Sequence, residues 1–316
     1  MSSSDAPGVT AAVLPPRNPS AHTVPPEVLR HVRRIEVRTR GPVNSLWAGE
    51  YRSVFKGQGM EFAEVREYLP GDDVRAIDWN VTARMRRPFV RRYEEARELT
   101  VMLLVDLSGS ERFGTKGRFK SDLAVELAAV LALAAVRNND RVGLTLFTDR
   151  IEHEVPPRKG RRHALRVLRD LLSTTPVGRA TDIAGAVVHV GKMLRQKAVI
   201  FIVSDFAAPD LERSLKRLGR RHDVIAVTVS DPGEDALPDV GLARFVDPET
   251  GAELEVDTSD PAVRTAFAAN VAADAEARTR ALRRSGVDEI AVRTDRGYVQ
   301  PLLSFFKTRE TRVARR

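Results

Sequence analysis

The sequence predicts an α/β protein built on a doubly wound, mostly parallel sheet. Four short apolar runs lack polar alternation, which is the pattern of strands buried on both faces of a parallel sheet. Segments in which apolar residues recur at helical spacing separate these runs. This alternation of strands and helices is typical of βαβ units, in which helices cover both faces of one sheet.

The predicted strands follow one another through the carboxyl-terminal two thirds of the chain. Thr100–Val105 is apolar after its first residue and ends abruptly at Asp106. The other buried strands are expected at Val142–Phe147, Ala198–Val203 and Val224–Val229. Two shorter or more polar strands, Glu152–Val155 and Glu289–Arg293, are expected at edges of the sheet.

Helices are expected between and after these strands. Ser121–Asn138 is almost uninterrupted in Leu, Ala and Val, so it should be buried on most of its circumference. A long helix should begin at Pro261, with Asp260 as its N-cap, and end near Gly286. Shorter helices are predicted at His163–Leu172, Asp182–Leu194 and Leu211–Gly219.

The chain is expected to have three parts. Residues 1–40 should be disordered or loosely structured, because their first half is rich in Ser, Ala and Pro, although Glu27–Ile35 has a helical pattern. Residues 41–98 are charged and aromatic and are expected to pack on the core, with Trp79 among the contacts. Residues 99–316 form the α/β domain with C-terminal helices and a β-hairpin inserted at 242–257, around a Pro-Glu-Thr-Gly turn.

Charged residues are dense in the second part of the chain. A functional face would explain them, but a structural network of ion pairs that holds the segment together is the preferred interpretation. The residues concerned are Glu64, Arg66, Glu67, Asp72, Asp73, Arg75, Asp78 and Arg84.

Composition excludes several classes of protein. The sequence has no cysteine, so disulfides, zinc–thiolate sites and cysteine nucleophiles are excluded. The longest apolar run, Leu123–Val136, contains Glu126 and is too short to cross a membrane. Pro15 and Pro16 interrupt the only N-terminal stretch that a signal peptide would use, so a cytoplasmic protein is expected. The net charge of +8 favours acidic partners without choosing among them.

Oxygen-bearing side chains follow the first buried strand in the pattern D-x-S-x-S: Asp106, Ser108 and Ser110. Loops at the carboxyl ends of strands are the places where open α/β sheets bind ligands. A hard cation such as Mg²⁺ takes about six oxygen ligands and usually keeps several waters, so this loop supplies up to half of the shell. A turn in which these side chains cap backbone amides is the simpler alternative.

Two further strand ends should contribute to the same site. Thr181 stands at the start of a predicted helix, where a plain N-cap is the alternative, and Asp205 follows the strand Ala198–Val203. Asp149 and Asp231 also follow strands, but no motif assigns them to the site. The sequence therefore predicts a Mg²⁺ or Mn²⁺ site made of Asp106, Ser108, Ser110, Thr181 and Asp205.

This combination resembles the metal-ion-dependent adhesion site of von Willebrand factor A domains. The resemblance implies that the serine and threonine hydroxyls hold Mg²⁺ directly or through water, whereas the aspartates act mostly through water. Neutral hydroxyl ligands leave the cation under-neutralised, so it attracts a carboxylate from a protein partner.

Several longer motifs resemble a narrower family, the fifty-eighth among the domains of unknown function: GQGMEFAEVREYLPGDDVRAIDWNVTAR, SDF, RHDVIAVTVSDPGEDALPDVG and FVDPETGAELEVDT. These are bacterial proteins with a von Willebrand factor A-like core, often found with MoxR-type AAA+ ATPases. The resemblance implies a non-enzymatic adaptor that acts with such an ATPase in the assembly or maturation of protein complexes. Glu111 replaces the methionine of many relatives and adds negative charge beside the site.

Enzymatic sites are not expected. A magnesium-dependent aspartyl-phosphate phosphatase would place a second acid where this chain has Ser108. In GTKGRFKS, Phe119 replaces the glycine that a phosphate-binding loop needs before its lysine. Histidines such as His163, His189 and His222 lack metal-ligand spacing.

Nucleic-acid binding is the alternative from another class of function. Its support is a set of basic clusters without an accompanying recognition motif, so a solvated basic surface is the preferred explanation, and no nucleic acid is expected as a partner. The clusters are Arg84–Arg87, Arg91-Arg92, Arg158–Arg162 and Arg309–Arg316.

Overall fold

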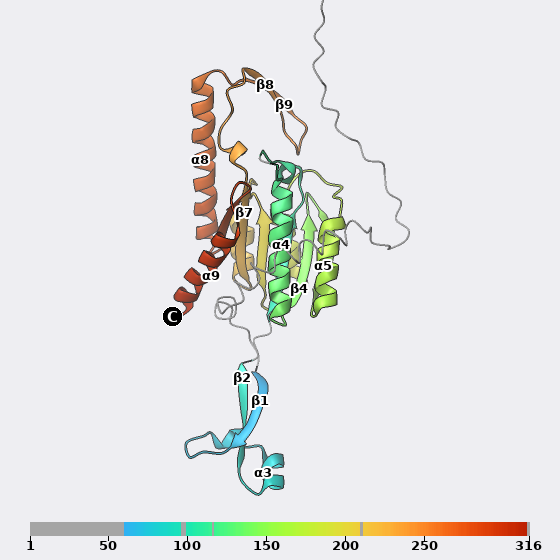
Figure 1. Cartoon of the computed structure of the whole chain (residues 1–316), viewed down its shortest axis with the longest axis vertical. Coiled ribbons are helices and arrows are strands. Elements are labelled where there is room, and N and C mark those ends of the chain that lie inside the picture. The colour runs from blue at the N-terminus through green and yellow to red at the C-terminus, as the bar shows by residue number, and fades with distance from the viewer. Residues whose placement is uncertain (1–59, 96–98, 116, 209–210, 315–316) are drawn as a thin grey trace, which may run out of the picture.

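The computed structural model describes residues 60–95, 99–115, 117–208 and 211–314. The expectations for residues 1–40, including the helix Glu27–Ile35, lie outside the described residues. At the centre is a six-stranded sheet in the order β10-β7-β6-β3-β4-β5, parallel except for β5 (Figure 1). Its strands are β3 Thr100–Asp106, β4 Arg141–Phe147, β5 Ile151–Arg158, β6 Val199–Ser204, β7 Asp223–Ser230 and β10 Asp288–Arg293. The predicted fold class, a doubly wound α/β protein with a mostly parallel sheet, is confirmed.

Helices cover both faces of this sheet. On β3 the buried side chains alternate: Val101, Leu103 and Val105 face one apolar cluster, whereas Met102 and Leu104 face the other. The first cluster is completed by α4, α5 and α9, and the second by α6, α7 and the end of α8. The helices are α4 Lys120–Arg137, α5 Arg161–Ser173, α6 Ile183–Met193, α7 Glu212–Gly219, α8 Pro261–Arg284 and α9 Val299–Ala314. Burial on both faces explains why β3 reads as an uninterrupted apolar run.

The strand order places a topological switch point between β3 and β6. After β3 the chain continues to β4 and β5 on one side, and it then returns to β6 on the other side. The pairing of Val105 with Val203 brings the carboxyl ends of β3 and β6 to the same edge of the sheet. Ligands of open α/β sheets bind in the crevice at such a point. The two strand ends that meet there carry Asp106 and Asp205.

Residues 60–95 form a small unit of their own. The antiparallel strands β1 Met60–Glu67 and β2 Phe89–Glu95 enclose the 3₁₀ helix η1 Val74–Ala76 and the helix α3 Trp79–Met85. In Figure 1 this unit lies apart from the six-stranded sheet. The side chain of Trp79 is 69% exposed, so it does not make the core contact expected for it.

The charged residues of this unit hold its turns together. The guanidinium of Arg66 donates to both carboxylate oxygens of Asp72, at 2.9 and 2.6 Å. Asp73 and Asp78 accept backbone amides as the N-caps of η1 and α3. These contacts favour the structural interpretation of the charged segment.

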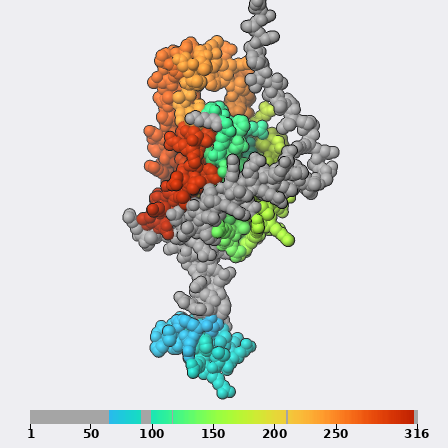
Figure 2. Space-filling view, viewed as in Figure 1, coloured from blue at the N-terminus to red at the C-terminus, as the bar shows by residue number. Residues whose placement is uncertain are grey.

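A second small sheet follows β7. The hairpin strands β8 Leu242–Val246 and β9 Glu253–Asp257 pair antiparallel where the inserted hairpin is expected. Asp260 caps the following helix α8, and its carboxylate accepts the amide of Ala262 at 2.8 Å. Only Leu282, near the end of α8, is fully buried in that helix. The hairpin and most of α8 therefore stand clear of the core, as the orange segments above α4 in Figure 2. Among the helices in the described ranges, none combines the length and hydropathy of a membrane span.

His222 gives the core a dependence on pH. Both ring nitrogens are buried without a hydrogen-bond partner, and burial, with the charge of Arg221 adding to it, lowers the pKa of this histidine from 6.5. The unfolded chain therefore takes up a proton first as the pH falls. Stability from a neutral His222 is complete above the unfolded pKa and is lost as the pH falls below it.

We expect His222→Leu to reduce the loss of stability between pH 8 and pH 5.5, measured by urea unfolding. The quantity to compare is the difference between the variant and the wild type at each pH, because the pKa of Asp106 is raised to about 6 and acts in the opposite direction. A difference that stays constant across this pH range would contradict the prediction.

Candidate metal centre

Asp106 is the last residue of β3 and is fully buried. Its Oδ1 accepts the backbone N–H of Ser108 at 2.8 Å, and its Oδ2 accepts the hydroxyl of Ser204 at 2.7 Å. Burial raises the pKa of Asp106 to about 6, although these hydrogen bonds oppose the shift. Because Ser204 ends the neighbouring strand β6, the carboxylate is fixed at the switch point of the sheet.

The two serines of the D-x-S-x-S loop lie side by side. Their hydroxyl oxygens are 3.1 Å apart, and Ser110 belongs to the 3₁₀ helix η2 Gly109–Arg112. Ser110 also hydrogen-bonds the carboxylate of Asp205. Ser108, Ser110, Asp106 and Asp205 are thus brought together as predicted. The simpler alternative also holds in part, since Asp106 does cap the amide of Ser108.

Asp205 leaves β6 toward the same loop. Its Oδ1 accepts the amide of Ala207 at 3.1 Å, and its Oδ2 accepts the Lys120 ammonium at 2.9 Å. Burial alone would raise the pKa of Asp205, but the charge of Lys120 and these hydrogen bonds hold it below its usual value. The next residue, Phe206, has a φ of 55° and is buried. Such a backbone costs of order 1 kcal/mol or more and is kept only where the surroundings enforce it.

Lys120 was not predicted as a member of the site. It is the first residue of α4 and is only 1% exposed. Besides Asp205, its ammonium contacts Oε1 of Glu234 at 2.7 Å, in the 3₁₀ helix η3 Pro232–Glu234. Burial would lower the pKa of Lys120, but the charges of Asp205, Glu111 and Glu234 raise it above its usual value.

Glu111 is the most unusual residue of the cluster. It is 1% exposed, and neither of its carboxylate oxygens has a hydrogen-bond partner among the residues that the structure describes. Burial and the neighbouring carboxylates of Asp205 and Asp106 raise its pKa well above the ordinary value. Carboxylate oxygens of Asp106, Glu111 and Asp205 lie within 4.8 Å of one another. A buried acid without a partner costs free energy when it is ionised, so a cation beside Glu111 would stabilise its carboxylate.

The donor set suits a hard divalent cation. Three buried carboxylates lie within 4.8 Å of one another beside a pair of serine hydroxyls that are 3.1 Å apart, and oxygen is the ligand type that Mg²⁺ and Mn²⁺ prefer. Lys120 balances only one of the four carboxylates of Asp106, Glu111, Asp205 and Glu234. A divalent cation would balance two more and would give the oxygens of Glu111 a partner.

Thr181 does not cap the helix that follows it, which was the alternative to a place in the metal site. Asp182, not Thr181, is the N-cap of α6 and accepts the amide of Gly185. The loop that carries Thr181 reaches the site through Arg179, whose carbonyl accepts the amide of Gly109 at 2.7 Å. The hydroxyl of Thr181 donates to Oε1 of Glu249 at 2.6 Å. The tip of the hairpin between β8 and β9 therefore contacts the site, which the sequence did not predict.

Asp149 and Asp231 have other roles. Asp149 is paired with Arg150 at the surface. Asp231 is buried. Its Oδ1 accepts the hydroxyl of Thr115 at 2.5 Å, and its Oδ2 accepts the hydroxyl of Thr294. It joins the loop before α4 to the end of β10, which is a structural function.

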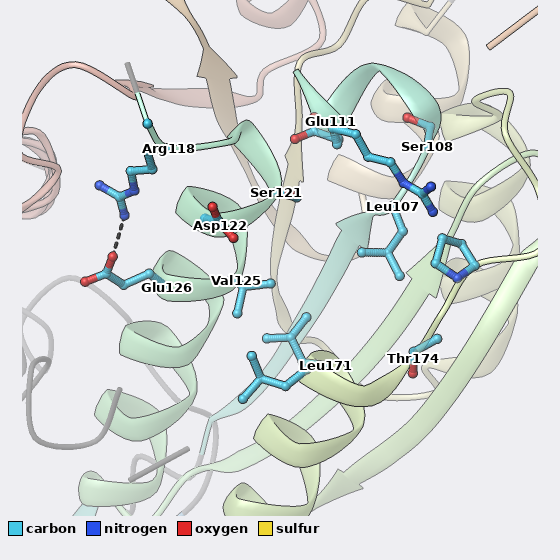
Figure 3. A pocket seen from close by; sticks show the side chains of 14 residues that line it. Leu107, Ser108, Glu111, Arg118, Ser121, Asp122, Val125, Glu126, Leu171 and Thr174 are labelled. Carbon is cyan, nitrogen blue, oxygen red and sulfur yellow. Dashed lines mark hydrogen bonds and ion pairs between the residues drawn. The ribbon is translucent and has the colours of Figure 1, made fainter. Parts of the chain in front are cut away.

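An open cleft of about 820 Å³ begins at the site. Figure 3 shows Ser108 and Glu111 at one end, and α4 and α5 along its sides. Arg118 lies at its margin and pairs with Glu126 of α4. A partner that reaches the site therefore has a groove of mixed polarity beside it.

Two arginines of the basic C-terminal cluster, Arg309 and Arg312, form ion pairs within the protein. Arg309 pairs with Asp223 and Asp288, and Arg312 also pairs with Asp288. These ion pairs fix α9 to the ends of β7 and β10. They leave less charge for nucleic acid than the sequence suggests.

The chain is similar to known proteins over most of its length. The family model described as protein of unknown function DUF58 matches residues 64–277. The uncharacterized protein Rv1480 of Mycobacterium tuberculosis (strain ATCC 25618 / H37Rv) is 34% identical over 312 residues, which cover 98% of this chain and 97% of the relative.

Two solved structures are similar at low identity. The conserved hypothetical protein BatB from Bacteroides thetaiotaomicron is 14% identical, with 67% of this chain and 99% of that one covered at a TM-score of 0.46. The SpRpn10 VWA domain is 12% identical, with 65% and 94% covered at a TM-score of 0.34.

Proposed function

Because this chain belongs to the DUF58 family, whose matched relative is itself uncharacterized, we propose a function from the site: a metal-dependent, non-enzymatic protein-binding adaptor. The metal is Mg²⁺ or Mn²⁺, held by Asp106, Ser108, Ser110 and Asp205 with Thr181 alongside. The observation that carries the proposal is the unpartnered, buried carboxylate of Glu111 among two other carboxylates and two hydroxyls.

Some residues of the site orient its carboxylates, and others supply neutral ligands. Ser204 and the amide of Ser108 orient Asp106, and Lys120 orients Asp205, so neither carboxylate has to reorganise when a ligand arrives. The two serine hydroxyls contribute no charge. A bound cation would supply an electrophilic position for a carboxylate of the partner. The cleft beside the site would receive the rest of that partner.

The family resemblance supports a class of partner. We propose a MoxR-type AAA+ ATPase, which would offer an acidic residue to the site during assembly or maturation of protein complexes. If the protein is such an adaptor, the ATPase should be retained on the immobilised protein in the presence of Mg²⁺ and released when EDTA removes the metal.

Metal binding is tested by calorimetric titration of Mg²⁺ and Mn²⁺ into the wild type and into Ser108→Ala/Ser110→Ala. We expect one saturable site in the wild type and affinity weakened at least about 10–100-fold in the variant, because two ligand hydroxyls are lost. Ser304→Ala/Thr311→Ala is the matched control, since both residues carry exposed hydroxyls on α9. Equal binding by the wild type and the site variant would contradict the proposal.

A further inference from the structure

The hairpin of β8 and β9 returns to the sheet at its tip. In Figure 1 its strands lie above the six-stranded sheet. The turn between them points down toward the start of α4 and the carboxyl edge of the sheet. Residues 247–251 form this turn, and Glu249 is half-buried there while its neighbours in the turn are exposed. Because Glu249 is half-buried while the rest of the turn is exposed, its side chain points toward the protein.

Two loops of the metal centre receive the tip. Oε1 of Glu249 accepts the hydroxyl of Thr181 at 2.6 Å. The backbone of Pro248 lies against Gly109, where an added Cβ would be 2.4 Å from the Pro248 carbonyl oxygen. Gly109 separates the two serines of the D-x-S-x-S loop. The tip thus contacts both loops that carry hydroxyl ligands.

The turn presents Glu249 in a fixed orientation. The carboxylate of Asp247 accepts the Glu249 amide at 2.9 Å and the Thr250 hydroxyl at 2.7 Å. The amide of Gly251 donates to the Asp247 carbonyl at 2.8 Å, and Gly251 has a φ of 74°, which favours glycine. These bonds close the turn on itself, so the carboxylate of Glu249 remains available for an outside contact.

The rest of the hairpin holds the tip only weakly. Leu242 and Leu254 are 72% and 64% exposed, and β8 and β9 pair only with each other. An isolated two-stranded hairpin is marginally stable. The tip can therefore leave the metal centre without opening the core.

From these contacts we infer that Glu249 is the internal carboxylate of the metal centre. While the hairpin is docked, Glu249 occupies the position beside the cation. An acidic residue of the partner would occupy the same position after the hairpin has moved away. The inference rests on the proposed metal-dependent function and adds its regulation. With the hairpin docked, Glu249 adds negative charge beside the cation and covers Thr181. A partner must displace Glu249 before its own acid can bind, so the resting protein is closed.

The test uses Glu249→Gln, with Glu255→Gln on the exposed part of β9 as the matched control. Each is titrated with Mn²⁺ in the calorimeter. We expect the dissociation constant to rise about tenfold in Glu249→Gln, because a carboxylate near the cation is lost, and to stay unchanged in the control.

A second readout follows the hairpin itself. Because the sequence has no cysteine, Leu254→Cys carries a single nitroxide label. We expect Mg²⁺ to slow the motion of the label in the wild-type background and in Glu255→Gln, but not in Glu249→Gln.

The outcomes separate the two proposals. If the wild type binds no metal, the proposed function fails and the inference fails with it. If the wild type binds metal, and Glu249→Gln matches it in either affinity or label mobility, the inference is overturned and the metal site stands. Tighter binding by Glu249→Gln also overturns it, because Glu249 would then obstruct the cation.

Discussion

Replacing Lys120 by methionine is expected to lower the free energy of unfolding of the metal-free protein by about 3–5 kcal/mol. The ammonium contacts Asp205 at 2.9 Å and Glu234 at 2.7 Å. Removing it leaves buried carboxylates facing Asp106 and Glu111 with no cation. The side chain of Asp205 is 11% exposed and that of Glu234 is 33% exposed, so most of the loss should come from Asp205.

Urea unfolding in EDTA, followed by circular dichroism, measures this loss. Lys216→Met is the control, because Lys216 is half-exposed and pairs with Glu212 along α7. Its loss should be within about 0.5 kcal/mol. Addition of Mg²⁺ should restore more stability to Lys120→Met than it adds to the wild type, since the variant lacks a positive charge. If Lys120→Met and the wild type have the same urea midpoint in EDTA, the Lys120 ammonium does not stabilise the carboxylate cluster.

The core strands and four of the five predicted site residues could be placed from local pattern. An apolar run such as Thr100–Val105 identifies a buried parallel strand, and parallel pairing brings the ends of β3 and β6 to one edge. Asp106, Ser108, Ser110 and Asp205 meet for that reason. Their meeting depends only on strand register, which the sequence strongly specifies.

Lys120 and Glu234 could not be placed in this way. Lys120 contacts Asp205 across 85 residues and Glu234 across 114, so the contacts depend on where α4 begins and on the path of the chain after β7. A lysine at a helix start is exposed in most proteins, and nothing local marks this one as buried.

Thr181 and Trp79 show two other limits of the sequence. The position of Thr181 was predicted, but its contact with Glu249 depends on an inserted hairpin 68 residues away. Within the described part of the chain, the two-stranded sheet beside Trp79 has no second layer on which its ring could pack, and this explains its exposure. An aromatic residue predicts a buried contact only where a second layer exists.

Replacing Glu111 by glutamine is expected to stabilise the metal-free protein and to reduce the gain that Mg²⁺ provides. Glu111 is buried, its carboxylate oxygens have no hydrogen-bond partner, and Asp106 and Asp205 lie beside it. Its raised pKa means that stability falls as the pH rises from the unfolded value toward the folded one. A glutamine amide has no charge and can donate to the neighbouring carboxylates, which an ionised glutamate cannot do.

The stability advantage of the variant should therefore shrink when the metal binds. In EDTA at pH 8 we expect Glu111→Gln to be more stable by about 1–3 kcal/mol, whereas Mg²⁺ at 100 times its dissociation constant should add about 2.7 kcal/mol to the wild type. The variant should gain less, because it has lost a carboxylate that balances the cation. Glu276→Gln, on the exposed face of α8, controls for the loss of one acid.

If Glu111→Gln is destabilised in EDTA, Glu111 has a partner within the fold, and the argument for a missing cation fails. If it is stabilised and gains as much from Mg²⁺ as the wild type does, the cation binds away from Glu111. Stabilisation of the variant in EDTA together with a smaller gain from Mg²⁺ is the result that places the cation at this carboxylate.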